Sequence, residues 1–190
     1  MATPKRYPPV KPICGVLYAD PEAWRLARGR LEEAFGSIES ETEPVPFVHT
    51  AYYESEMGPT HRLYLAFERL RPAEFLVEAK WTTNRIETEL RRPEGGRRVN
   101  LDIGYLSAAK VVLATMKDYG HRIYLGRGVL GDVELHYQSG AFRPWPWTYP
   151  DYAEPETRAF FVAVRRRYLE QLRRAGIPAT PQEPWVEEER

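Results

Sequence analysis

The chain of 190 residues contains a single cysteine, Cys14. One cysteine excludes an intrachain disulfide and a zinc site built from several thiolates. No apolar run approaches the roughly eighteen residues of a membrane span. The N-terminal segment MATPKRYPPVKP lacks the apolar stretch of a secretion signal. We therefore expect a cytoplasmic protein of bacterial type that has no membrane partner.

An excess of charge of either sign is also missing. The 27 basic and 27 acidic side chains balance, which argues against a general polyanion binder. Lysine is scarce, because arginine supplies all but five of the basic residues. Against that background, an internal lysine is a candidate for a role that requires a compact ammonium group, and a solvated surface lysine is the alternative. The internal lysines considered are Lys80, Lys110 and Lys117.

Several signatures of nucleotide and hydrolase chemistry are absent as well. The sequence has no P-loop, no dinucleotide-binding glycine motif after a strand, no nucleophile elbow and no H-E-x-x-H zinc motif. The histidines share no metal-ligand spacing, so we predict no metal site of the protein's own. If a phosphate ligand binds, Mg²⁺ could accompany it, since carboxylates and phosphate oxygens leave little trace in a sequence.

Hydrophobic periodicity predicts an alternation of strands and helices in the first half of the chain. Asp20 is the expected N-cap of the first helix, with Pro21 at its first position, and Gly36 ends it. The acidic segment 37–46 is predicted as a loop. The order βαββαβ indicates a ferredoxin-like start. The predicted elements are a strand over 13–18, a helix over 21–35, strands over 47–54 and 61–67, a helix over 72–90 and a strand over 99–103.

Further strands are predicted over 111–116, 121–126 and 129–137, the last two joined at Arg127-Gly128. They extend the sheet as a β-meander, and a final helix from Pro155 to Gly176 closes the fold. The predicted fold class is therefore α+β. We expect one domain over residues 1–176, with an extended N-terminal segment over 1–12, followed by a flexible, acidic and proline-rich tail over 177–190.

Ionisable and aromatic residues are concentrated between Arg97 and Tyr152. Three cationic side chains flank a predicted turn at 118–120, where two strands end. Cations in such a position can hold a phosphate, and a histidine can transfer a proton near neutral pH. The candidate catalytic residues are His121 and Asp102. The candidate ligand-binding residues are Lys110, Lys117, Asp118, His121, Arg122, Tyr105, Trp147 and Tyr149.

Each of these features also has a structural interpretation. The turn can be a strand-end network of ion pairs among Asp102, Asp118, Lys117 and Arg122. The aromatic-proline segment 145–152 can be a rigid strap across the core edge or a stacking platform for a base or sugar. Lys80, Asn84 and Glu87 share one face of the second helix, which either lines a cleft or forms a solvated stripe.

Three functional hypotheses follow. The leading one is the binding of a phosphorylated small molecule or nucleotide at the Lys117–Arg122 turn. The second is a non-catalytic module that binds protein or RNA through the arginine-rich last helix. The third is a phosphoester hydrolase, suggested by the similar pentapeptides that begin at His61 and His121. Leu63 and Ile123 weaken it, because paired-histidine phosphoesterases carry a hydroxyl residue at those places.

Three stretches, FVHTAYYESEMG, RRVNLDIGYLSAAKVVLATMKDYGHRIYLGRG and PWTYPDY, together resemble a family of small bacterial proteins of unknown function. The resemblance extends to about Leu172. Members of that family are sometimes labelled as GTP-binding proteins, a label that no motif in this sequence supports. The family has tyrosine at the place of His49, which weakens a catalytic role for His49. The resemblance implies no established catalytic residues.

Overall fold

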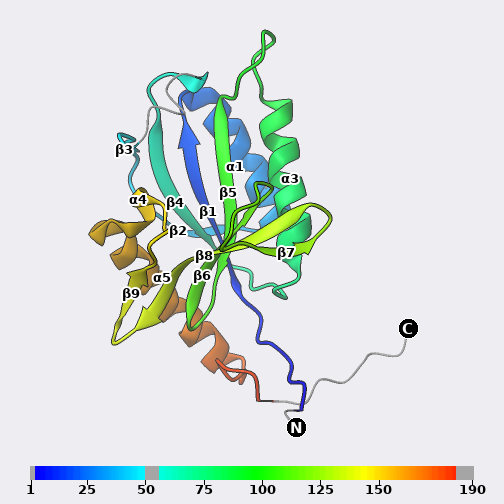
Figure 1. The fold of residues 1–190 in the computed structure, drawn as a ribbon, viewed down its shortest axis with the longest axis vertical. Helices are drawn as coiled ribbons and strands as arrows, with labels where there is room; N and C mark the ends of the chain where they lie inside the picture. Colours follow the sequence, from blue (N-terminus) through cyan, green and yellow to red (C-terminus); the bar gives the residue numbers. More distant parts are fainter. Residues whose placement is uncertain (1–2, 50–55, 183–190) are drawn as a thin grey trace.

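The computed structural model describes residues 3–49 and 56–182. These residues form one nine-stranded antiparallel sheet with helices on both faces (Figure 1). None of the helices in the described ranges has the length and apolar character needed to cross a membrane.

The first half of the sheet has the predicted ferredoxin-like topology. The strand order is β2-β4-β1-β5, and each neighbouring pair is antiparallel. This order confirms the α+β fold class. The elements are β1 (Lys11–Tyr18), α1 (Pro21–Phe35), β2 (Ile38–Glu41), β4 (His61–Phe67), α3 (Phe75–Glu89) and β5 (Val99–Leu106).

The second strand of the sheet was predicted over 47–54 but is formed by an earlier segment. Ile38–Glu41 forms β2 and Val45–Pro46 forms the short β3, and both pair with β4. The expectation of a loop over 37–46 was therefore wrong. Residues 47–49 of the predicted strand over 47–54 are not in a strand, and the rest of that segment lies outside the described residues. An edge strand can keep polar side chains in solvent, so the acidic composition concealed β2.

The second half contains β6 (Lys110–Thr115), β7 (Ile123–Gly126), β8 (Val129–Gln138), β9 (Ala141–Pro144), α4 (Pro150–Ala153) and α5 (Pro155–Arg174). The β7–β8 hairpin turns at Arg127-Gly128, where both residues have positive φ, as in the common two-residue hairpin turns. The strand order departs from a sequential meander at one point. β6 pairs directly with β8, and β7 and β9 pair with opposite ends of β8.

The sheet separates two apolar layers. α1 and α3 lie side by side over one face, where Ala27 and Leu31 of α1 are fully buried (Figure 1). α5 covers the other face with its predicted apolar stripe, which includes Phe161 and Tyr168. The predicted cap of α1 is confirmed, because Asp20 accepts hydrogen bonds from the first-turn amides of the helix.

The sheet forks between β5 and β6. Residues Gly104–Leu106 of β5 pair with Val111–Leu113 of β6, but the rest of β5 toward Val99 has no partner in β6. Gly104 occupies the last pair before the fork. A Cβ at that position would lie 2.3 Å from the carbonyl oxygen of Val112, so only glycine allows this close approach. The fork positions the candidate site.

Candidate functional site

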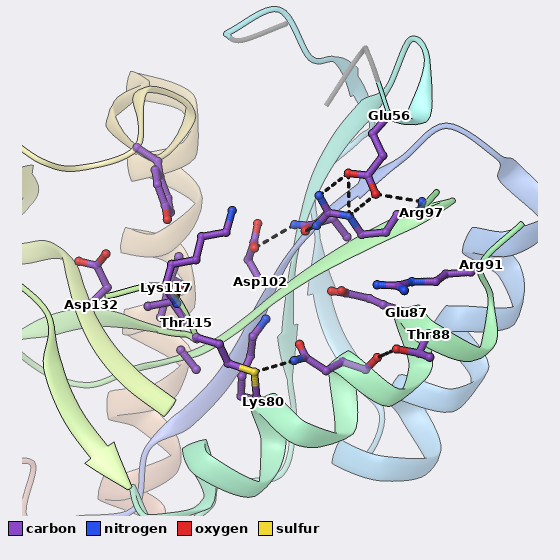
Figure 2. A pocket seen from close by; sticks show the side chains of 16 residues that line it. Glu56, Lys80, Glu87, Thr88, Arg91, Arg97, Asp102, Thr115, Lys117 and Asp132 are labelled. Atoms are coloured by element: carbon purple, nitrogen blue, oxygen red, sulfur yellow. Dashed lines mark hydrogen bonds and ion pairs between the residues drawn. The ribbon is translucent and has the colours of Figure 1, made fainter. Parts of the chain in front are cut away.

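The fork opens into a polar cleft of about 410 Å³, hereafter the fork cleft (Figure 2). α3 and β5 form one wall, and the segment that follows β6 forms the other, with β8 behind it. The lining residues are Glu56, Lys80, Asn84, Glu87, Thr88, Arg91, Arg97, Asn100, Asp102, Leu113, Ala114, Thr115, Met116, Lys117, Asp132 and Tyr149.

α3 supplies partners for the edge of β5 that β6 leaves open. The amide of Leu101 donates to Glu87 Oε1 at 2.6 Å, and Lys80 Nζ donates to the carbonyl oxygen of Leu101 at 3.5 Å. Burial raises the pKa of the Glu87 carboxyl, against the opposing effect of Lys80. Asn84 lies on the same face and also lines the cleft. The expectation that this face of the helix lines a cleft is confirmed.

The opposite wall carries Met116 and Lys117. Asn84 Nδ2 donates to Met116 Sδ at 2.9 Å, which links the two walls. Figure 2 shows the Lys117 ammonium pointing across the cleft toward Asp102. Two of the five lysines, Lys80 and Lys117, therefore reach the same cleft from opposite walls.

A chain of polar contacts closes one end of the cleft. Arg97 Nη2 donates to Glu56 Oε2 at 2.6 Å, and Arg97 Nη1 donates to Asn100 Oδ1 at 2.6 Å. Asn100 Nδ2 in turn donates to Asp102 Oδ1 at 2.9 Å. The hydrogen bonds from Arg97 hold the pKa of the Glu56 carboxyl below its usual range. These contacts fix the position of Asp102 at the cleft.

Asp102 also belongs to a buried ion-pair network that we call the Arg62 network. Arg62 Nη1 donates to Asp102 Oδ2 at 3.0 Å, Arg62 Nε donates to Asp151 Oδ2 at 2.6 Å, and the Tyr64 hydroxyl donates to the same Asp151 oxygen at 2.8 Å. Burial alone would lower the pKa of Arg62, but Asp151 and Asp102 keep it well above its ordinary value. Tyr152 packs beside Arg62. This network joins β4, β5 and α4.

His121 and Arg122 do not line the cleft, but both contact Asp132, which does. Arg122 Nε donates to Asp132 Oδ2 at 2.8 Å, and His121 Nε2 lies 3.3 Å from the same oxygen. Arg122 also donates to the Tyr149 hydroxyl at 2.9 Å and to the carbonyl oxygen of Lys117 at 2.8 Å. Burial opposes the charge on Arg122, but Asp132 and Tyr149 raise its pKa. The predicted network gave Arg122 the acidic partners Asp102 and Asp118, whereas in the described residues Arg122 pairs with Asp132 and Asp102 pairs with Arg62.

A β-bulge places Glu134 in the interior behind this wall. Val111 pairs with Leu135 and Val112 pairs with Val133, so Glu134 has no partner residue in β6. Its Oε2 accepts a hydrogen bond from the amide of Tyr149 at 2.9 Å. Burial, with a further contribution from neighbouring acids, raises the pKa of Glu134 to about 8. The carboxyl group is therefore largely neutral at pH 7.

The aromatic-proline segment packs as a strap across β8. Trp147 Nε1 donates to the carbonyl oxygen of Val133 at 3.1 Å. The Trp147 ring stacks on the rings of His121 and Trp145, with centroids 4.9 and 5.3 Å apart, and Trp145 packs against His136 at 4.3 Å. These contacts occupy ring surface that a stacked base would need, so they favour the strap interpretation.

The remaining predicted ligand residues lie elsewhere. Tyr105 and Lys110 line a separate, more apolar cavity of about 380 Å³ with Tyr7 and Leu125. Burial raises the pKa of Tyr105 to about 12. Asp118 is exposed in the loop between β6 and β7.

Of the predicted site residues, the fork cleft brings together Lys117, Tyr149 and the catalytic candidate Asp102. Three further predicted residues lie beside the cleft without lining it. His121 and Arg122 both contact Asp132, and Trp147 stacks on His121. Sequence reasoning missed the roles of Glu56, Arg97, Asn100 and Asp132. A signal existed only for Asp132, which stands with Glu134 among the apolar residues of the first part of β8, Val129–Leu135.

A metal centre is not evident in the described ranges, where no three His, Cys, Asp or Glu side chains gather in a way that could hold an ion. Any Mg²⁺ would therefore depend on oxygen atoms supplied by a ligand.

Comparison with known proteins places the chain in a family but gives no activity. No curated protein and no solved structure matches the chain. A family described as a domain of unknown function (DUF4416) matches residues 8–168, which is most of the chain and includes every residue of the fork cleft. The chain therefore belongs to this family of uncharacterised proteins.

Proposed function

We propose that the protein binds a phosphorylated small molecule or nucleotide in the fork cleft. The observation that carries the proposal is the convergence of Lys80 and Lys117 from opposite walls on one cleft, in a chain that uses lysine at only five positions. An ammonium group is a common phosphate ligand, and two of them can hold one phosphate from both sides.

The electrostatic balance of the cleft supports an anionic ligand. Three of its four acidic side chains form ion pairs with arginines: Glu56 with Arg97, Asp102 with Arg62, and Asp132 with Arg122. The fourth, Glu87, is buried and accepts a hydrogen bond from the amide of Leu101 at 2.6 Å. Lys80, by contrast, makes one long hydrogen bond to a backbone carbonyl oxygen. This contact of Lys80 therefore leaves its ammonium group able to donate further hydrogen bonds to an anion in the cleft.

The size of the cleft is also suitable. Small-molecule sites typically have volumes of about 300 to 1,000 Å³, and the fork cleft, at about 410 Å³, falls in this range. The three stretches that carry the family resemblance are far apart in the sequence, yet they supply one, eight and one of its sixteen lining residues. A shared cleft explains why these distant stretches belong together.

Neither alternative function gains comparable support. Most arginines of α5 bind within the molecule: Arg158 and Arg165 donate to backbone carbonyl oxygens, Arg167 bonds to β2, and Arg173 and Arg174 pair with Glu170. This engagement weakens the case for an RNA- or protein-binding surface there. Hydrolysis is not proposed, because His121 bonds to Asp132 and stacks on Trp147 instead of lining the cleft.

The test measures the melting temperature of the protein with pairs of compounds, in which one member carries a phosphate and the other is the same compound without it. We expect stabilisation only by phosphorylated members, since a ligand at one hundred times its Kd adds about 2.7 kcal/mol to the free energy of unfolding. The double variant Lys80→Met/Lys117→Met should lose the shift, while Lys110→Met, a lysine outside the cleft, should keep it. Retention of the shift in the double variant, or no shift in the wild type, would refute the proposal.

A further inference from the structure

We infer that the phosphorylated ligand of the fork cleft is a polyol or sugar phosphate, and not a nucleotide held by stacking of its base. This inference rests on the proposed function and narrows it to a ligand class. Three features of the described cleft wall carry it: a single aromatic residue, several side-chain oxygens that can accept further hydrogen bonds, and one buried carboxylate oxygen without a partner.

Among the described residues that line the cleft, Tyr149 is the one aromatic residue, and its hydroxyl is fixed by Arg122 at 2.9 Å. Trp145 and Trp147 stack on each other and on histidines, and neither lines the cleft. Proteins that bind bases without pairing to them rely strongly on aromatic ring faces. A nucleotide would therefore place its base against polar side chains.

The wall does offer partners for hydroxyl groups. A hydroxyl both donates and accepts, so it matches amides and carboxylates that retain free bonding capacity. Asn84 uses its Nδ2 on Met116 Sδ, a weak acceptor, and no described residue donates to its Oδ1. Asp102 accepts one hydrogen bond on each oxygen and projects toward the cleft (Figure 2). Each of these oxygens can accept a further hydrogen bond from a ligand hydroxyl.

Asp132 adds an acceptor that lacks a partner altogether. The Asp132 side chain is 2% exposed and lines the cleft, and its Oδ2 is taken by Arg122 and His121. Its Oδ1 is buried and has no hydrogen-bond partner. A buried unsatisfied oxygen is costly, and rotation of the Asp132 carboxylate toward the cleft would let a ligand hydroxyl donate to it and remove that cost. A phosphate dianion could not do so, because it has no hydrogen to donate.

The ligand implied by these groups has two unlike parts. The lysines favour a phosphate, whereas the side-chain oxygens of Asp102, Asp132 and Asn84 favour hydrogen-bond donors such as hydroxyl groups. A short hydroxylated chain or ring that bears one phosphate satisfies both requirements within about 410 Å³. The further phosphates of a di- or triphosphate supply acceptors, which these oxygens cannot bind directly.

Isothermal titration of the wild-type protein separates this inference from the proposed function. The probes are pentose and hexose monophosphates, glycerol phosphate, n-propyl phosphate and nucleoside monophosphates. We expect at least one polyol phosphate to bind about tenfold more tightly than n-propyl phosphate, since lost hydrogen bonds to buried groups cost about that factor. It should also bind more tightly than any nucleoside monophosphate, because the added base would lie against polar side chains. Equal or tighter binding of nucleotides or n-propyl phosphate would overturn this inference alone. Failure of every phosphorylated probe would overturn the proposed function, and this inference with it.

Two variants assign the selectivity to residues. Asn84→Leu should weaken binding of the best polyol phosphate about tenfold and leave n-propyl phosphate unchanged, because only the hydroxyl contact is removed. Lys80→Met should weaken both by a similar factor. An equal loss for both ligands in Asn84→Leu would contradict the assigned role of Asn84. Circular dichroism and the melting temperature confirm that each variant is folded.

Discussion

The Arg62 network and the fork cleft share Asp102 but use charge in different ways. In the network, Arg62 is buried and bonded to both Asp102 and Asp151, so positive and negative groups are matched at distances of 2.5 to 3.0 Å. In the cleft, Lys80 and Lys117 face an open volume of about 410 Å³. The comparison shows that a sequence segment rich in charged residues can form either of two structures, an internal ion-pair network or the wall of an open cleft. Groups matched within the protein stabilise the fold, and under our proposal groups that line an open cleft bind a ligand.

The strongest test of this contrast is Arg62→Met. Removing the guanidinium leaves Asp151 buried without its cation, which should lower the free energy of unfolding by about 3 to 5 kcal/mol. Urea denaturation measures the change. Arg166→Met on the exposed face of α5 is the matched control and should change stability by no more than about 0.5 kcal/mol. A loss below about 1 kcal/mol in Arg62→Met would mean that the network does not hold the fold.

A second test concerns the packing of Tyr152 against β1. A Cβ at Gly15 would lie 2.3 Å from the Tyr152 hydroxyl oxygen, so Gly15→Ala should cost about 1 to 3 kcal/mol. The Tyr152 hydroxyl has no hydrogen-bond partner, so Tyr152→Phe should cost little. In the double variant, Tyr152→Phe should recover part of the loss. Strictly additive effects would show that the clash is not with this hydroxyl.

Glu134 predicts a dependence of stability on pH. Its pKa in the folded protein is about 8, raised from an ordinary value of 4.5. Because the native state then binds more protons than the unfolded state, stability should fall as pH rises from about 5 to about 8, by up to about 1.4 kcal/mol per pH unit. Glu134→Gln should flatten this dependence in urea denaturation at several pH values. An unchanged slope in the variant would show that another group titrates.

The smallest effect on stability is expected in the cleft itself. Lys80→Met and Lys117→Met remove charges that face open volume, so each should change the free energy of unfolding by no more than about 0.5 kcal/mol. The same urea denaturation that is used for Arg62→Met makes the two regions directly comparable. If the double lysine variant were destabilised as strongly as Arg62→Met, the cleft charges would be structural and the contrast would fail.

The parts of the fold that follow from local rules were predictable. The Asp20-Pro21 cap, the stripe of α5 and the Arg127-Gly128 turn each depend on residues close together in the sequence. β2 was missed because an exposed edge strand needs few apolar residues, and its acidic composition is typical of a loop. Lys11 was placed in the extended N-terminal segment, yet it begins β1, where it is buried and paired with Glu39 at 2.6 Å.

The candidate site was predictable only in part. The sequence indicated Lys117, Asp102 and the face of α3, because unusual residue types stand there. The fork could not be foreseen, since the point at which β6 leaves β5 depends on sheet twist and strand pairing over long distances. The partner of Arg122 was also hidden. Asp132 faces it only because β6 bypasses β7 to pair with β8, an order that local patterns do not encode.

The most direct test of the central claim is a crystal structure of the protein soaked with a hexose monophosphate. The account predicts phosphate density within hydrogen-bond distance of both Lys80 Nζ and Lys117 Nζ, with hydroxyl groups directed to Asp102 and Asn84. Density at the arginines of α5 or on the tryptophan strap, with an empty fork cleft, would contradict it.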